Sequence, residues 1–361
     1  MNVLQEKRNE INQIDGEMAK LFERRMRACE SVAEYKKEHA LPILDAAREA
    51  EVIANGAMRI EDETLREYYI SFLKDVIKIS RCYQSRLLEG MRVVYSGAEG
   101  AFAHMAAKKA FPQAQTQACA DFAEAYRAVE DGTFDCAVLP IENSYAGDVG
   151  TVMDLMFMGN LYVSRVVELE VTHCLVAKKG ASLGEIKTVI SHPQALEQCS
   201  EFIAANGLKT LTYANTALAA QYVAESGDNS LAAIASAEAA QTFGLEVLAK
   251  GIQTSSGNTT RFAVLSRVQT LPAPTDRTGN EHFMLMFTTK NEAGALVQPL
   301  NILGAHNFNM RTLISRPMKD SAWSYYFFVE AEGNINTASG QDMMRELSAV
   351  CSKLKLLGSY R

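Results

Sequence analysis

Residues 11–35, INQIDGEMAKLFERRMRACESVAEY, decide the fold of the N-terminal part of the chain. Apolar side chains recur there at alternating spacings of three and four residues, the period of one helix face. The stripe predicts a helix over about residues 2–38, which Pro42 would end. Such a helix is about 50 Å long. It is too long to be covered by the short segments that follow, so we expect a second copy of the chain to pack on it.

Two further helices complete the predicted N-terminal part. The first is expected over about residues 45–57, and the second over about residues 64–88. The second carries an apolar stripe at helical spacing, formed by Leu65, Tyr69, Phe72, Val76, Ile79, Tyr83 and Leu87. Residues 1–90 therefore predict an all-α unit, called the helical module below.

From Met91 onward, apolar runs of strand length alternate with helical segments. This alternation predicts an α/β module over residues 92–268, with largely parallel strands. Residues 271–280, LPAPTDRTGN, are rich in Pro, Gly and polar residues and are typical of a linker. Residues 281–361 follow the order strand, helix, strand, strand, helix, strand, which predicts a ferredoxin-like α+β sandwich, called the C-terminal module.

The composition of this 361-residue chain excludes several classes of protein. Its 36 basic and 43 acidic residues give a net charge of −7, which disfavours nucleic-acid binding. Its apolar runs are shorter than the roughly 18 residues of a membrane helix, and the charged N-terminus does not resemble a signal peptide. The seven cysteines form no C-x-x-C pair, which disfavours a disulfide or zinc framework. We therefore expect a cytoplasmic protein with no metal, membrane or nucleic-acid partner.

Charged residues lie on apolar faces of the helical module. Arg25 falls on the stripe of the first helix, where an unpaired charge costs several kcal/mol. An excess of such cations favours a small dianionic ligand, although edge residues with solvated charges are the alternative. The other polar groups on or beside these faces are Arg8, Lys36, Arg48, Glu49, Ser80 and Gln84.

Five segments of this module together resemble the helical chorismate mutases: RNEINQID (8–15), ERR (23–25), KK (36–37), PILDAARE (42–49) and SRCYQ (80–84). In that family a domain-swapped helical dimer binds chorismate between its helices. The resemblance implies that arginines hold the substrate carboxylates, that Gln84 and Lys36 contact the ether oxygen, and that Glu49 contacts the ring hydroxyl. It implies a site formed by Arg8 from the partner copy with Arg25, Lys36, Asp45, Arg48, Glu49, Ser80 and Gln84.

The α/β module contains four short polar motifs, GAEGAF (97–102), PIENS (140–144), SHPQAL (191–196) and NTTRF (258–262). The first places backbone N–H groups at a predicted helix N-terminus, which suits a carboxylate. The second and third follow predicted strands, at the edge where open α/β sheets bind ligands. Each motif alone is more often a turn or a cap than a binding site.

Together the four motifs resemble prephenate dehydratase over about residues 92–268. In that family the site lies between two lobes of a periplasmic-binding-like fold. The resemblance implies that Thr260 is the essential threonine, which we interpret as a hydrogen-bond donor to the departing hydroxyl. It implies that Arg261 binds a carboxylate, and it leaves the proton donor open. The residues expected to line the cleft are Glu142, Asn143, Ser144 and His192.

The C-terminal module resembles an ACT domain, a family that binds phenylalanine at a dimer interface. Residues 294–296, Gly-Ala-Leu, and residues 314–317, Ile-Ser-Arg-Pro, match its G-A-L and E-S-R-P elements. Ile314 replaces the glutamate of the second element, which leaves open whether phenylalanine still inhibits. The resemblance implies an effector site formed by Gly294, Ala295, Leu296, Ser315 and Arg316.

The order of the three modules is similar to that of the bifunctional chorismate mutase–prephenate dehydratases. The resemblance implies a cofactor-free homodimer or tetramer that converts chorismate through prephenate to phenylpyruvate, under feedback by L-phenylalanine. A mutase–dehydrogenase would need a complete dinucleotide fingerprint, and the G-x-x-G of residues 97–100 is not one. A non-catalytic amino-acid sensor built from binding-protein lobes and an ACT domain is the alternative. It leaves Arg25 and Thr260 without a role.

Overall fold

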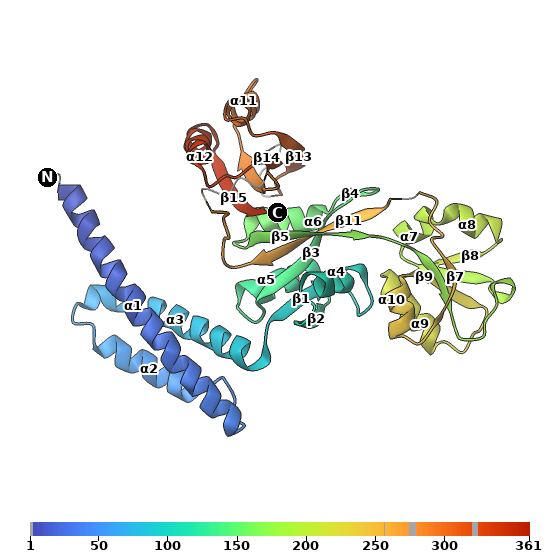
Figure 1. The fold of residues 1–361 in the computed structure, drawn as a ribbon, viewed down its shortest axis with the longest axis horizontal. Coiled ribbons are helices and arrows are strands. Elements are labelled where there is room, and N and C mark those ends of the chain that lie inside the picture. Colours follow the sequence, from blue (N-terminus) through green and yellow to red (C-terminus); the bar gives the residue numbers. More distant parts are fainter. Residues whose placement is uncertain (1–2, 256, 274–278, 320–323) are drawn as a thin grey trace. The chain divides into compact units, whose positions relative to one another are not determined.

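The structure of the protein is a computed structural model that describes residues 3–255, 257–273, 279–319 and 324–361. The chain forms two units, Met1–Arg92 and Val93–Arg361 (Figure 1), and each is described by itself. Part of the expected linker, residues 274–278, lies outside the described residues. No helix in the described ranges is both long enough and apolar enough to cross a membrane.

Three helices form the first unit, as predicted: α1 (Val3–Glu38), α2 (Ala46–Met58) and α3 (Glu63–Glu89). The Asp45 side chain caps α2 by accepting a hydrogen bond from the Arg48 backbone N–H at 3.0 Å. Ile11, Ile14 and Leu21 on the α1 stripe are 49–59% exposed. A single copy therefore leaves much of this apolar face uncovered, which is typical of a surface that packs against another chain.

The first lobe of the α/β module is a sheet with the strand order β2-β1-β3-β11-β5, with β4 paired to β3. Its strands are β1 (Arg92–Ser96), β2 (Gln115–Cys119), β3 (Cys136–Asn143), β4 (Gly147–Asp148), β5 (Tyr162–Glu170) and β11 (Thr259–Ser266). Its helices are α4 (Phe102–Ala110), α5 (Phe122–Glu130) and α6 (Gly150–Met158).

The second lobe is a five-stranded sheet with the order β10-β6-β9-β7-β8. Its strands are β6 (Cys174–Ala177), β7 (Thr188–Ser191), β8 (Lys209–Thr212), β9 (Leu231–Ala235) and β10 (Glu246–Lys250). Its helices are α7 (Pro193–Gln198), α8 (Ser200–Ala205), α9 (Thr216–Glu225) and α10 (Ala237–Thr242), with a 3₁₀ turn, η1, at Leu183–Glu185.

The prediction of largely parallel strands is wrong, because both sheets are mixed. Strand β11 runs antiparallel to both β3 and β5, and β6 runs antiparallel to both β9 and β10. The reason is that the chain leaves the first lobe after β5 and returns to it only as β11, without a helical crossover. The two connections between the lobes lie side by side, since the Val171 N–H donates to the Asn258 carbonyl at 2.7 Å.

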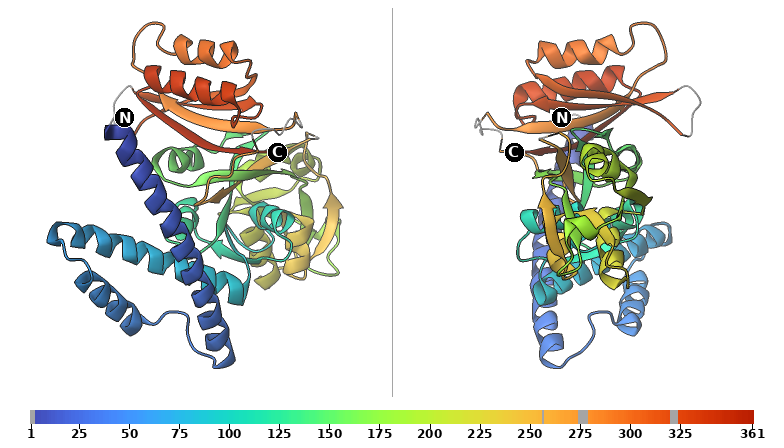
Figure 2. Two further views of the ribbon diagram at one scale, coloured as in Figure 1. Left: turned by 60° about the vertical axis from the view of Figure 1, so that its left-hand side comes forward. Right: turned by 90° about the vertical axis from the view of Figure 1, so that its right-hand side faces the viewer.

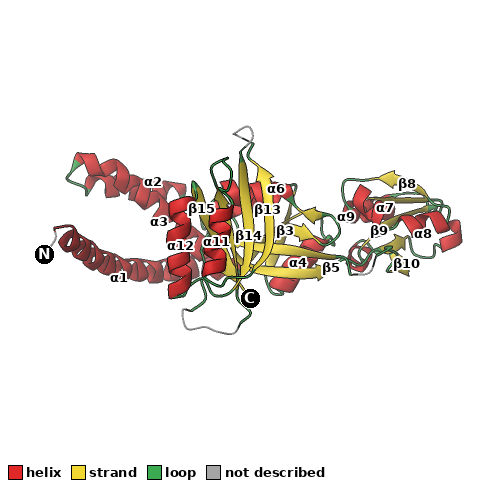
Figure 3. Cartoon of the chain, turned by 90° about the horizontal axis from the view of Figure 1, so that it is seen from above, coloured by secondary structure: helices red, strands yellow, loops and turns green. Residues whose placement is uncertain are grey.

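The C-terminal module has the predicted order of elements. These are β12 (His282–Thr288), α11 (Val297–Ala305), β13 (Met310–Pro317), β14 (Tyr325–Glu332), α12 (Ala338–Val350) and β15 (Lys353–Tyr360). The antiparallel sheet has the order β13-β14-β12-β15. Helices α11 and α12 lie together on one of its faces (Figures 2 and 3).

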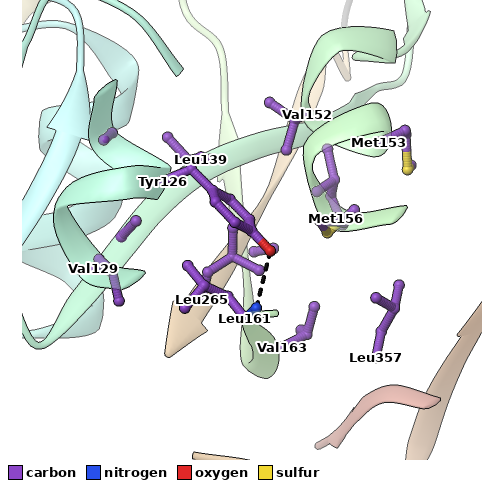
Figure 4. Packing of buried hydrophobic residues seen from close by; sticks show 14 of the residues in the cluster. Tyr126, Val129, Leu139, Val152, Met153, Met156, Leu161, Val163, Leu265 and Leu357 are labelled. Carbon is purple, nitrogen blue, oxygen red and sulfur yellow. Dashed lines mark hydrogen bonds between the residues drawn. The ribbon is translucent and has the colours of Figure 1, made fainter. Parts of the chain in front are cut away.

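The other face of this sheet shares a core with the first lobe. Leu357 of β15 belongs to the same buried cluster as Tyr126, Met153 and Leu161 (Figure 4). The approach is close, because a Cβ on Gly358 would overlap the carbonyl oxygen of Val163 on β5. The C-terminal sheet is thus continuous with the hydrophobic core of the α/β module and is not a loosely tethered domain.

Candidate functional site

A cavity of about 750 Å³ lies among the three helices of the helical module. Its walls are mainly apolar side chains such as Phe22, Phe72 and Val76, and Arg25 and Arg48 are among the cations that line it. Guanidinium groups in a mainly apolar cavity suit a small ligand with two carboxylates, because each can bind a carboxylate bidentately.

A residue of α3 fixes the orientation of the Arg25 side chain. It donates a hydrogen bond to the Ser80 hydroxyl, which is 3% exposed and itself donates to the Val76 carbonyl at 2.7 Å. One turn further along α3, Gln84 is buried, and its Oε1 has no hydrogen-bond partner among the described residues. The polar residues that interrupt the apolar stripe of α3 therefore face the interior of the module.

Three more predicted residues of this module, Lys36, Asp45 and Glu49, make contacts within one copy. Lys36 Nζ donates to the Ile43 carbonyl at 2.6 Å, and Glu49 lies 3.5 Å from Arg81 in an ion pair. Together with the Asp45 cap they fix α2 and the loop before it. These three side chains are outside the set of described residues that lines the cavity.

Arg8 is exposed near the start of α1, about 25 Å along the helix from Arg25. One copy of the chain therefore does not bring these two arginines together. The structure also adds two cavity-lining residues that the sequence motifs did not single out, Asn55 and Arg59 on and after α2.

A second cavity, of about 160 Å³, lies where the two lobes of the α/β module meet, and is called the cleft below. The first lobe contributes β3, β11 and the start of α4, and the second lobe contributes α7 and the start of α9. The lining residues are Phe102, Asn143, Val171, His173, His192, Gln194, Ala195, Gln198, Asn215, Thr216, Asn258 and Thr260.

Thr260 and Asn143 are paired across β11 and β3. Asn143 Nδ2 donates to Thr260 Oγ1 at 2.9 Å and to Asn258 Oδ1 at 2.7 Å, while Asn143 Oδ1 accepts from the backbone N–H groups of Tyr145 and Ala146. These contacts fix the orientation of the Asn143 amide. Because Thr260 Oγ1 accepts from Asn143, its own hydroxyl hydrogen is available for donation to a ligand.

Two further residues of the predicted set lie at or near the cleft. His192 lines it and caps α7, since its Nδ1 accepts from the Gln194 N–H at 3.3 Å. Ser144 is exposed and ties the end of β3 to β11, because its Oγ accepts from the Thr259 N–H at 3.0 Å and donates to the Gly257 carbonyl at 3.3 Å.

Arg261 points away from Thr260, because neighbouring side chains on a strand face opposite sides of the sheet. Its guanidinium donates two hydrogen bonds to Glu330 of β14, at 2.8 and 2.9 Å, one to Glu142 at 3.0 Å and one to the Tyr360 hydroxyl at 2.7 Å. The structure therefore places Arg261 and Glu142 at the contact with the C-terminal module, and brings Thr260, Asn143 and His192 together in the cleft.

Hydrogen bonding keeps both Arg261 and Glu330 in their charged forms. Burial alone would lower the pKa of Arg261, but its bonds to Glu330 and Glu142 raise it. Burial alone would raise the pKa of Glu330, but the hydrogen bonds from Arg261 and Tyr360 lower it below its ordinary value. Both groups are thus charged at neutral pH, and Glu330 is 1% exposed.

Arg316, expected at the effector site, also contacts the first lobe. Its guanidinium donates to Asp148 at 2.7 Å and to Asp154 at 3.3 Å, and the Tyr326 hydroxyl donates to Asp154 at 2.7 Å. The guanidinium lies so close to Gly150 that a Cβ there would overlap it.

The other expected effector residues lie on two elements of the C-terminal module. Gly294, with φ +80°, and Ala295 precede α11, and Leu296 packs into the core of this module. Ser315 is exposed on the edge strand β13. Ile314, on the same strand, packs against the core shared with the first lobe.

The sequence motifs did not point to several residues of the cleft. Gln198 follows the SHPQAL motif by two residues and could have been found by extending it, whereas Asn258 is the first residue of NTTRF itself but was given no role. His173 and the Asn215–Thr216 pair have no local motif. They reach the cleft only because the connection before β6 and the start of α9 meet there.

Two protein-family models match separate parts of the chain. The chorismate mutase type II family model matches residues 7–85, and the prephenate dehydratase family model matches residues 93–270. The bifunctional chorismate mutase/prephenate dehydratase of Enterobacter agglomerans is 32% identical over 98% of this chain and 94% of that protein. The chain belongs to the family of bifunctional chorismate mutase/prephenate dehydratases.

Two further relatives each match about three quarters of this chain. A chloroplastic arogenate dehydratase/prephenate dehydratase of Arabidopsis thaliana is 35% identical, over 75% of this chain and 72% of that protein. The crystal structure of prephenate dehydratase from Arthrobacter aurescens in complex with L-Phe matches with a TM-score of 0.69 and 27% identity. It covers 75% of this chain and 89% of that one.

Proposed function

We propose that the cavity of the helical module and the cleft of the α/β module are the two active sites of this bifunctional enzyme. The chain carries the chorismate mutase and prephenate dehydratase activities of phenylalanine biosynthesis. The module boundaries that we propose are 1–90 for the mutase, 92–268 for the dehydratase and 281–361 for a regulatory domain, with residues 271–280 as the linker.

In the helical cavity, Arg25 and Arg48 bind the two carboxylates of chorismate and hold it folded for the pericyclic rearrangement to prephenate. Holding the reacting ends together can contribute about 7–11 kcal/mol at best. Gln84 and Lys36 stabilise the negative charge that grows on the ether oxygen, a second and electrostatic contribution. Support comes from the cavity-lining guanidiniums of Arg25 and Arg48 and from the Ser80 contact that orients Arg25.

We propose that the mutase site is completed by a second copy of the chain. Arg8 lies far from Arg25 on the same helix, and the α1 stripe is exposed, so a partner packed along α1 could supply its own Arg8. In that dimer, the substrate would also contact Lys36, Asp45 and Glu49. A homodimer, or a tetramer built from it, is the proposed assembly.

In the cleft, the Thr260 hydroxyl donates a hydrogen bond to the ring hydroxyl of prephenate, which departs as carbon dioxide is lost and the ring becomes aromatic. The departing carboxylate lies against apolar side chains of the cleft, those of Val171, Ala195 and Phe102. Backbone N–H groups at the start of α9 suit the second carboxylate. The observation that carries this assignment is the Asn143–Thr260 hydrogen bond inside the cleft.

We propose that L-phenylalanine acts as an effector at the C-terminal module, through Gly294, Ala295, Leu296, Ser315 and Arg316. A related prephenate dehydratase has been solved with L-Phe. Arg316 already binds Asp148 and Asp154 of the first lobe. An effector that binds this strand would therefore change these contacts with the first lobe. The seven free thiols fit a reducing compartment, and we propose the cytoplasm.

The test supplies the purified full-length chain with chorismate alone and follows prephenate and phenylpyruvate with time. We expect prephenate to appear first and phenylpyruvate to follow without any added cofactor. Binding of phenylalanine with neither product formed would instead support the non-catalytic sensor. Prephenate accumulating without phenylpyruvate would refute the assignment of the cleft.

A further inference from the structure

Two buried polar atoms in residues that line the cleft lack a partner in the described part of the chain. They are Nδ1 of His173 and Nε2 of Gln198. His173 is 2% exposed and Gln198 is 7% exposed. Native proteins satisfy nearly all such groups, and an exception needs an explanation. A ligand that binds in the cleft and pairs with these two atoms is one such explanation.

The hydrogens on these two side chains follow from their neighbours. Gln198 Oε1 accepts from Asn258 Nδ2 at 3.2 Å and lies 2.8 Å from His173 Nε2. An amide oxygen only accepts hydrogen bonds, so His173 Nε2 carries a hydrogen and Nδ1 of the neutral ring carries none. The opposite orientation of the Gln198 amide would set its NH₂ group against Asn258 Nδ2, a donor whose orientation is fixed because Asn258 Oδ1 accepts from Asn143.

The same amides connect His173 to Thr260. Gln198 accepts from Asn258, Asn258 Oδ1 accepts from Asn143, and Asn143 donates to Thr260. Every link joins neutral groups. His173 and Thr260 are therefore held by one continuous hydrogen-bond network that runs along the junction of the two lobes.

The described side chains that contact His173 are uncharged. Phe102 of α4 meets its ring edge-on with centroids 5.8 Å apart, and Gln198 of α7 and Gln253 of the second connection contact it. None of the described residues lining the cleft is Asp, Glu, Lys or Arg. The titratable groups nearby are His192 across the cleft, the buried thiols Cys174 and Cys199, and Tyr145 and Glu197 of the small cavity beyond Gln198.

We propose that His173 is the proton donor of the dehydratase. The two carboxylates of prephenate bring negative charge into a cleft whose described lining residues include no lysine or arginine. The imidazolium form of His173 is stabilised by that charge, and its Nδ1–H donates to the ring hydroxyl that departs. Gln198 Nε2 donates to the same oxygen.

The proposed step balances. The bond between the ring and its carboxylate breaks, and its electron pair enters the ring as carbon dioxide leaves. The bond between the opposite ring carbon and the hydroxyl breaks, and the oxygen takes the Nδ1 proton and leaves as water. His173 is left with a hydrogen on Nε2 alone, the tautomer that the Gln198 contact holds in the free protein. Solvent then returns the proton to Nδ1.

Burial lowers the pKa of His173 in the free protein, and its hydrogen bond to Gln198 opposes that shift only in part. Bound dianion must raise the pKa again. Since kcat/KM reports the free enzyme and kcat the substrate complex, both should fall at alkaline pH, with the fall in kcat/KM at the lower pH.

This inference rests on the proposed dehydratase site, and Thr260→Ala tests that site separately. The decisive measurement is the pH dependence of prephenate turnover by the full-length protein, with an enzyme-free blank at each pH. For the wild type we expect an alkaline fall in kcat and a solvent deuterium isotope effect on it. A kcat that is flat from pH 6 to pH 9 would overturn the proposal, whatever the variants do.

His173→Gln should lower kcat about 10²–10⁴-fold, remove the alkaline fall, and leave mutase activity as the internal check of folding. His173→Ala should be partly rescued by added imidazole. His39→Gln, in the helical module, is the matched control and should keep the wild-type profile. Loss of the alkaline fall in His192→Gln, with its retention in His173→Gln, would assign the proton donor to His192 and overturn the proposal.

Discussion

Arg261 and the buried Glu330 form a largely buried ion pair with two hydrogen bonds between the α/β module and the C-terminal module. Arg261 is the residue next to Thr260 on β11, so the strand that carries the proposed catalytic threonine is also the strand held by the C-terminal sheet. The strand of the dehydratase site is therefore fixed on its opposite face by Glu330, about 70 positions later in the chain.

Glu330→Ala should destabilise the second unit. Removing one partner leaves Arg261 buried with only part of its charge compensated, which typically costs about 3 kcal/mol or more. The free energy of unfolding, measured by urea denaturation with a probe in the second unit, checks this. Glu332→Ala is the matched control two residues along β14, where the side chain is exposed. Equal effects of the two variants would contradict the structural role of the pair.

The ion pair also predicts a pH dependence of stability. The pKa of Glu330 is lower in the folded protein than in the unfolded chain, where it is about 4.3. Its contribution is therefore complete above that value and is lost as the pH falls through the folded pKa. The difference in unfolding free energy between wild type and Glu330→Gln should be largest above about pH 5 and shrink on acidification. A difference that grew on acidification would contradict this sign.

The mutase site should be restored in mixed dimers. Arg8→Ala and Arg48→Ala are each expected to be inactive, because Arg8 of one copy and Arg48 of the other serve the same site. After the two variants are mixed and allowed to exchange subunits, one site in each mixed dimer has both residues intact. Mutase activity should recover to about a quarter of the wild-type value at equal amounts, because half of the dimers are mixed. No recovery, with exchange verified, would argue against a shared site.

The cleft should discriminate against arogenate, which carries an ammonium group where prephenate carries a keto oxygen. The described residues that line the cleft include no carboxylate to pair with that ammonium. We expect kcat/KM for prephenate to exceed that for arogenate at least about tenfold, a difference of about 1.4 kcal/mol. Competition between the two substrates in one reaction measures the ratio. A preference for arogenate would require a carboxylate partner that this cleft does not offer.

Local patterns predicted the elements well and the pairing of strands less well. The stripe from Ile11 to Tyr35 and the order of the C-terminal elements depend on side-chain period alone, and both predictions are confirmed. The insertion of β11 between β3 and β5 depends on a return of the chain after the whole second lobe, which no local pattern records.

Local motifs likewise predicted some residues of the site and missed others. Asn143 and Thr260 lie in motifs and meet in the cleft, whereas His173 has no motif and reaches it through the junction of the lobes. Arg261 lies in a motif too, but the alternation of side chains along β11 turns it to the opposite face, toward Glu330. A motif locates a segment, and the sheet decides which of its side chains reach the site.

The most direct test of two separate active sites measures both half-reactions in two variants of the full-length chain. Arg25→Ala should lose the conversion of chorismate to prephenate and still dehydrate added prephenate at the wild-type rate. Thr260→Ala should do the reverse, since effects at distant, independent sites do not couple. Loss of both activities in either folded variant would contradict the assignment of one reaction to each cavity.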